Sequence, residues 1–151
     1  MPSIALTGKD TIKINDRILN DQADGDVANL TFPSDISTIK TGKNGNSIYS
    51  FNNTGRQAEV TIRVLRGSAD DKYLNGLLAL QKNEPSTFVL MAGEFTKHIG
   101  DGAGNLTTDT YIMQGGIFKK QVEVKENADG DVEQAVSVYT LAFANAPRTI
   151  S

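Results

Sequence analysis

Polar and apolar residues alternate strictly from Gln57 to Val64 within the segment 57–65, which is the clearest pattern in the chain. The apolar positions are Ala58, Val60, Ile62 and Val64. The polar positions between them are Gln57, Glu59, Thr61 and Arg63. Successive side chains of a β-strand point to opposite faces of the sheet. The pattern therefore predicts a strand with one face in a core and one polar face.

A helical pattern follows this strand almost directly. Ser68 is a favourable N-cap, and Asp71 three residues later gives a variant of the capping box. Asp70 and Asp71 both fall in the first turn, where the helix dipole favours acids, so capping accounts for the pair. Apolar residues then recur at helical spacing at Tyr73, Leu74, Leu77, Leu78 and Leu80. We predict an amphipathic helix that ends near Lys82, before Pro85.

Other segments predict further strands, separated by turns rich in Gly, Asn and Asp. The predicted strands are residues 11–15 with a continuation at 17–19, then 27–32, 47–51, 87–99, 111–125 and 134–143. Turns are predicted at 21–26, 52–55, 100–105 and 127–131, and a bend or bulge at Gly115 and Gly116. Ile36 and Ile39 lie in a segment without a clear assignment.

Strands joined by short turns pair antiparallel. The predicted fold is mainly β, an antiparallel β-sandwich or barrel with one short flanking α-helix and an extended hairpin loop, in a single domain of residues 1–151.

The late strands are predicted to be apolar on both faces. In segment 87–99, for example, Phe88 and Leu90 alternate with Val89 and Met91. In a small antiparallel domain, one face of each sheet is normally exposed to solvent. Something must then cover the second face, and the candidates are the helix and a neighbouring subunit.

Composition excludes several classes of protein. The chain has 151 residues and no Cys, which excludes thiol catalysis, thiolate metal sites and a disulfide scaffold. It carries 15 basic and 18 acidic residues, a net charge of −3, which argues against binding nucleic acid through phosphates. No apolar run approaches the roughly 20 residues of a membrane span, and we predict no signal peptide.

Candidate chemistry is sparse, and turn or capping roles explain it better than catalysis. His98 is the only His, and no partner acid or nucleophile is identifiable for it. Segments 20–25 and 125–130 resemble calcium loops, but neither has Glu at the twelfth position. The alternating Gly residues at 100–104 precede no helix, so they predict a loop tip. We therefore predict no enzyme activity, no metal and no cofactor.

Three consecutive stretches carry a family resemblance. They are residues 42–55 (GKNGNSIYSFNNTG), 59–65 (EVTIRVL) and 68–74 (SADDKYL). Their order resembles the middle of the tail tube proteins of contractile-tailed bacteriophages, which are similar to the tube proteins of type VI secretion and of pyocins. The resemblance extends over residues 11–146. Asp70-Asp71 departs from the Asn-Asp or Asn-Glu of the family, but it leaves the capping intact.

The resemblance implies a structural virion protein. Its copies would form rings, typically hexameric, that stack into a hollow tube for DNA ejection into the host. The implied partners are other copies of the chain, the tail sheath, a baseplate or initiator, the tape measure and the tail terminator. DNA would pass without specific binding, and nothing would insert into a membrane. Assembly would take place in the host bacterial cytoplasm, and the product would belong to the phage tail.

The resemblance also implies residue roles. Segment 41–56 would reach a neighbouring subunit or ring through Lys43, Asn44, Asn46, Tyr49, Phe51, Asn53 and Arg56. A polar, non-basic lumen would be lined by Gln57, Glu59, Thr61, Gln121 and Glu123. Two alternatives remain open at this point: a β-sandwich binding or adhesion module of a baseplate or another phage structural component, and a small β-barrel enzyme. The scarcity of aromatic residues in the predicted loops counts against the binding module, and the lack of a site counts against the enzyme.

Overall fold

The computed structural model describes residues 3–23, 27–126, 128, 130 and 132–151, and it is mainly β with one α-helix. A large antiparallel sheet has the strand order β3-β2-β8-β9-β10-β7-β4, with β1 on β8 and β11 on β9. Strands β5 and β6 form a separate two-stranded sheet. The strands are β1 (Ala5–Leu6), β2 (Thr11–Ile14), β3 (Arg17–Ile18), β4 (Ala28–Thr31), β5 (Ser37–Thr41), β6 (Ser47–Phe51), β7 (Ala58–Leu65), β8 (Met91–Gly100), β9 (Leu106–Phe118), β10 (Val136–Asn145) and β11 (Arg148–Ile150). The helices are α1 (Ala69–Asn83) and two short 3-10 turns, η1 (Asn53–Arg56) and η2 (Val132–Ala135).

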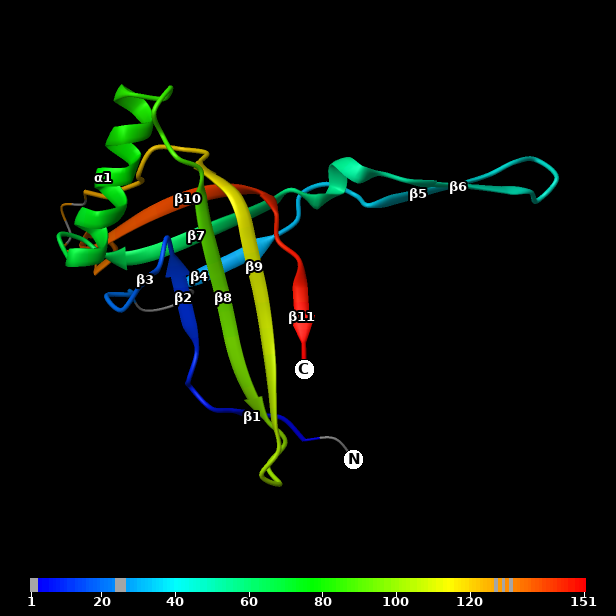
Figure 1. The fold of residues 1–151 in the computed structure, drawn as a ribbon, viewed down its shortest axis with the longest axis horizontal. Helices are drawn as coiled ribbons and strands as arrows, with labels where there is room; N and C mark the ends of the chain where they lie inside the picture. Colours follow the sequence, from blue (N-terminus) through cyan, green and yellow to red (C-terminus); the bar gives the residue numbers. More distant parts are fainter. Residues whose placement is uncertain (1–2, 24–26, 127, 129, 131) are drawn as a thin grey trace.

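The large sheet is strongly bent. Figure 1 shows β8 and β9 running across the direction of β4, β7 and β10, with α1 at one end and the β5–β6 hairpin extending from the other. This arrangement fits the predicted sandwich with one flanking helix.

The core lies between the inner face of the bent sheet and α1. The predicted inner face of β7 is confirmed, because Ala58, Val60, Ile62 and Val64 are all fully buried. Leu74 and Leu78 of α1 and Tyr139, Leu141 and Phe143 of β10 pack in the same cluster. The apolar side chains of the alternating strand and those of the amphipathic helix therefore pack in one hydrophobic core.

The predicted N-cap of α1 is also confirmed. The Ser68 hydroxyl accepts a hydrogen bond from the Asp71 backbone N–H at 3.3 Å, and the Asp71 carboxylate accepts one from the Gly67 N–H at 2.8 Å. Asp71 also accepts hydrogen bonds from the Ser137 and Tyr139 hydroxyls of β10. Burial, and then the hydrogen bond to Asp71, raises the pKa of Tyr139, which keeps its hydroxyl protonated as a donor. The cap thus ties the helix to the sheet.

Asp70 also makes long-range contacts that its position in the sequence does not indicate. It is buried, and its carboxylate accepts hydrogen bonds from Arg17 Nε at 2.9 Å and from the backbone N–H groups of Asn20 and Asp21, each at 2.7 Å. Arg17 also lies over the ring of Tyr73, with its guanidinium carbon 5.2 Å from the ring centroid. Asp70 therefore fastens the segment after β3 to the first turn of α1.

Several predicted boundaries were wrong. β8 begins at Met91 rather than at residue 87, and Val89 and Leu90 before it are exposed. The alternation over 87–90 therefore does not define two sheet faces. β9 begins five residues earlier than predicted, because the Asp101 carboxylate accepts the backbone N–H groups of Ala103 and Asn105 and closes a tight turn. That turn lets both strands run to the hairpin tip.

β9 also ends at Phe118 rather than at residue 125, so Gln121 and Glu123 do not lie on it. The chain leaves the ladder there, and Glu123 then pairs with Val138 of β10 at an isolated bridge. The predicted bulge is confirmed: the register shifts between Met91 and Gly93, opposite Gly115, whose φ of 66° favours glycine.

Other predictions need smaller changes. The turn predicted at 52–55 overlaps η1, and the last strand, predicted at 134–143, is β10. Strands β1, β5 and β11 were missed. The turns predicted at 21–26 and 127–131 include residues 24–26, 127, 129 and 131, which lie outside the described ranges.

A pair of glycine substitutions tests the packing of β9 on β10. A Cβ at Gly116 would lie 2.4 Å from Cε1 of Phe143 and 3.0 Å from the Met91 carbonyl oxygen. We expect Gly116→Ala to lower the free energy of unfolding by about 1–3 kcal/mol, because the strand or the ring must shift. The control is Gly76→Ala in α1, where nothing lies within 4 Å and alanine should stabilise by about 0.5–1 kcal/mol. Urea unfolding of both variants measures the difference, and effects of the same sign would contradict this packing.

Candidate assembly surfaces

The β5–β6 hairpin, with residues 36–52 referred to here as the arm, stands apart from the core. Every residue of β5 and β6 is exposed. Figure 1 shows the arm extending well beyond the rest of the molecule. A two-stranded hairpin on its own is only marginally stable in water. The arm therefore lacks the cover that would normally stabilise such a ribbon.

The register of the arm sorts its side chains onto two different faces. Ile39 pairs with Tyr49, and Ser37 with Phe51, and directly opposite residues share a face. One face of the arm, its apolar face, therefore carries Ile39, Tyr49 and Phe51, which are 58%, 65% and 83% exposed. The other face carries Thr38, Lys40, Ile48 and Ser50. Three large exposed apolar side chains on one face of a projecting hairpin are typical of a surface that binds another molecule.

Local chemistry explains why the arm forms at this place. At its tip the Gly42 N–H donates to the Asn46 carbonyl at 2.7 Å, and Gly45 has a φ of 85°, which favours glycine. At its base the Asn52 N–H donates to the Ile36 carbonyl at 2.7 Å. Gly55 is buried there, and a Cβ on it would lie 2.6 Å from the Asp35 carbonyl oxygen. The base is therefore fixed, and the arm leaves the domain in a defined direction.

The arm is longer at its start than predicted. The sequence predicted an extended loop over 41–56, whereas β5 begins at Ser37. Tyr49 and Phe51 lie on the apolar face. Lys43, Asn44 and Asn46 lie in or beside the tip, and Asn53 and Arg56 lie in η1 at the base. The predicted contact residues thus divide into a face, a tip and a base.

The outer face of the sheet, on the side opposite the core, is polar along β7, while β9 adds the exposed Ile117 beside Ala142. Glu59 and Thr61 on β7 lie opposite Ala142 and Thr140 on β10, and all four are half-buried. Of the predicted lumen residues, the structure brings Glu59 and Thr61 together. Gln57 precedes β7, while Gln121 and Glu123 follow β9 on an irregular segment.

Charges on this outer face are mostly paired. Lys119 forms an ion pair with Glu59, and Arg63 forms one with Glu133 at 2.9 Å. Glu123 pairs with Val138, which is itself the partner of Arg63. The outer face of β7 and β10 therefore carries acidic, basic and threonine side chains. The described residues form no cluster of basic side chains there.

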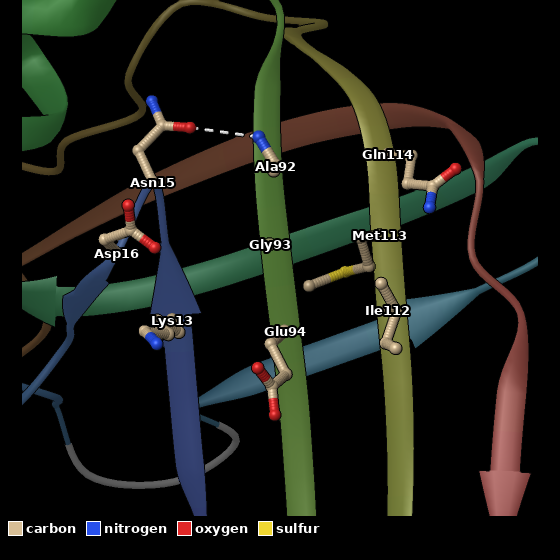
Figure 2. Close-up of a pocket in the computed structure, with 9 residues that line it drawn as sticks. All are labelled: Lys13, Asn15, Asp16, Ala92, Gly93, Glu94, Ile112, Met113 and Gln114. Carbon is tan, nitrogen blue, oxygen red and sulfur yellow. Dashed lines mark hydrogen bonds between the residues drawn. The ribbon is translucent and has the colours of Figure 1, made fainter.

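The same face continues across β2 and β8, where it is hollowed into a small pocket. Figure 2 shows Lys13 on β2 and Glu94 on β8, which are cross-strand partners, with Asp16 near Lys13 and with Gln114 on β9 at the other side of the pocket. The pocket has a volume of about 240 Å³ and contains neither hydroxyl nor imidazole side chains in its lining. Asn15 Oδ1 accepts a hydrogen bond from the Ala92 N–H at 3.0 Å. This bond joins the turn after β2 to β8 at the edge of the pocket. Ala92, Ile112 and Met113 also line the pocket, so it combines an apolar part with the charged side chains of β2 and β8.

His98 lies near the far end of β8. Its Nδ1 is 3.4 Å from the Thr108 hydroxyl. Over the described ranges, no group of three or more His, Asp or Glu side chains is arranged to hold a metal ion. None of the helices in the described part of the chain is long and apolar enough to cross a membrane.

Comparison with known proteins adds no family assignment. No model of a known protein family matches this chain, and no curated protein sequence matches it either.

Proposed function

We propose that the protein is a structural subunit that assembles with copies of itself into rings and, by stacking, into a hollow tube of a contractile phage tail or a related injection system. The observation that carries the proposal is the arm, whose apolar face is exposed and is covered by none of the residues that the structure describes. Burying Ile39, Tyr49 and Phe51 against a second copy removes apolar area from water. It also stabilises a hairpin that is marginal alone.

The proposal of rings specifies how the arm binds. The arm projects from one end of the domain, and in this proposal it binds a different surface of the neighbouring copy. When such a contact repeats head to tail from copy to copy, it generates a closed ring or an open helix. Pairing of two arms, or reciprocal exchange of arms between two copies, would instead give a two-fold dimer, which is the outcome that contradicts the proposal.

The polar outer face supports the role of a conduit. Glu59, Thr61 and the paired Arg63 give a wall that is not basic, so it would not retain DNA through its phosphates. In this proposal the copies sit in a virion tail assembled in the bacterial cytoplasm. The sheath, baseplate or initiator, tape measure and tail terminator are the other partners, and the chain itself carries out no catalysis.

Sedimentation velocity over a hundredfold range of protein concentration tests the proposal. We expect monomers at the lowest concentration and larger species of one discrete size, or long polymers, at the highest. A two-fold dimer as the end point would contradict head-to-tail assembly, and a monomer throughout the range would contradict assembly itself.

A further inference from the structure

The tip of the arm contains an asparagine that is followed by a glycine, Asn44-Gly45. Asparagine is among the thermolabile residues of proteins. The backbone nitrogen of the next residue can attack its side-chain carbonyl carbon, and a glycine, which has no Cβ, hinders this attack least. Both residues are exposed, and Figure 1 shows the tip at the end of the arm that is farthest from the core.

The reaction consumes water and needs no other partner. The Gly45 nitrogen loses its proton to solvent base and forms a bond to Cγ of Asn44. The bond from Cγ to Nδ2 breaks, and the freed nitrogen takes one proton from water and leaves as ammonia, so that a cyclic imide remains. Water then opens the imide at either carbonyl. Opening at Cγ gives aspartate, and opening at the backbone carbonyl gives isoaspartate, whose main chain runs through the former side chain.

Hydrogen bonds in the tip determine how often this attack can occur. The Gly45 N–H donates to the Gly42 carbonyl at 3.0 Å, so the attacking nitrogen is engaged while the tip is closed. The hairpin around this bond is exposed along both strands. A two-stranded hairpin of this kind is only marginally stable on its own. The tip therefore opens by local fraying, which costs less free energy than opening an element that is packed on the core.

A second Asn-Gly pair in the same chain serves as an internal reference. Asn75 and Gly76 are exposed as well, but they lie in the interior of α1. The same turn of α1 is held by Leu74 and Leu78, which are buried in the core. In an α-helix the N–H of residue 76 is bonded to the carbonyl four residues before it. The two pairs therefore match in sequence and exposure and differ in backbone structure.

We propose that Asn44 is a self-modification site, which converts to aspartate and isoaspartate in the folded protein while Asn75 stays intact. This inference goes beyond the proposed function and does not depend on assembly. The arm contains Lys40 and Lys43 and no acid. Each conversion therefore places the first carboxylate in the arm, directly beside Lys43. Isoaspartate also adds one carbon to the main chain of a tight turn, which disturbs its hydrogen bonding.

Peptide mapping by mass spectrometry, after incubation at mildly alkaline pH, tests the proposal. Trypsin cleaves after lysine and arginine, so it releases residues 44–56 and 73–82 as separate peptides with one Asn-Gly pair each. The protein is kept dilute so that no second copy covers the tip, and a digest at time zero corrects for conversion during digestion. We expect Asn44 to convert at least about tenfold faster than Asn75, because the tip opens at a lower free-energy cost than the helix.

Incubation in guanidinium chloride separates the effect of structure from that of sequence. The unfolded chain exposes both pairs equally, so their rates of conversion should become similar. Asn44→Gln should remove the acidic product from an isoelectric focusing gel, because glutamine would have to close a larger ring, and the matched variant Asn46→Gln should retain that product. Equal rates in the folded protein, conversion of Asn44 only in the denaturant, or conversion mainly at Asn46 would overturn the proposal.

Discussion

We expect that replacing both Tyr49 and Phe51 with serine abolishes the proposed self-assembly and leaves the fold intact. This is the largest effect that we expect from any surface change. Each aromatic side chain that is buried in a contact contributes about 1.5–3 kcal/mol. Losing two of them costs each contact at least about 3 kcal/mol, which weakens its affinity about a hundredfold or more. Sedimentation velocity measures the assembly.

The domain itself should not respond to this double variant. Both side chains are exposed, and neither belongs to the core. Surface substitutions of this kind usually change stability by no more than about 0.5 kcal/mol. The matched control is Ile48→Ser, which removes an equally exposed apolar side chain from the opposite face of the same strand. The control should assemble like the wild type, and loss of assembly in the control alone would show that the wrong face was assigned.

Asp70→Ala has the second large expected effect, and it acts on stability. The substitution removes the acceptor of three hydrogen bonds, from Arg17 and from the backbone N–H groups of Asn20 and Asp21. Removing one partner of a buried ion pair typically costs about 3–5 kcal/mol. Arg17 keeps partial access to water, with 38% of its side chain exposed. We therefore expect a loss near the lower end of that range, measured by urea unfolding.

A neighbouring residue supplies the control for Asp70. Lys72 lies in the same turn of α1 and is exposed. Lys72→Ala should change the free energy of unfolding by no more than about 0.5 kcal/mol. A loss below about 1 kcal/mol in Asp70→Ala, comparable with a single ordinary hydrogen bond, would contradict the fastening role of Asp70.

The elements predicted best are those whose local pattern agrees with their burial. β7 alternates strictly because one face lies in the core and the other is polar, and its boundaries shift by a single residue. α1 has a cap and an apolar stripe, so its start and its buried face were both predictable. In these segments the sequence carries the information locally.

The remaining errors come from places where tertiary contacts decide the structure. β5 has one large apolar side chain among five residues and is fully exposed, so no burial pattern marks it. β11 has three residues and is held on β9 by pairing and by the Arg148–Asp109 ion pair. The role of Asp70 depends on Arg17, fifty-three positions away, which no local spacing indicates.

The candidate assembly surfaces divide in the same way. Tyr49 and Phe51 were predicted as contact residues from the resemblance, and the β5–β6 register adds Ile39 on the same face. Gln121 and Glu123 were assigned to a strand wall by extending an alternation past Phe118, where the chain leaves the ladder.

Negative-stain electron microscopy of the concentrated wild-type protein tests the central claim most directly. An arm-deleted variant, in which Asn-Gly replaces residues 37–51, is imaged beside it; this short bridge suffices because the Asn52 N–H and the Ile36 carbonyl are 2.7 Å apart. The account predicts rings or tubes of one uniform width with a central channel in the wild type, and only small single particles in the variant. Single particles in both samples, or tubes in the arm-deleted variant, would contradict it.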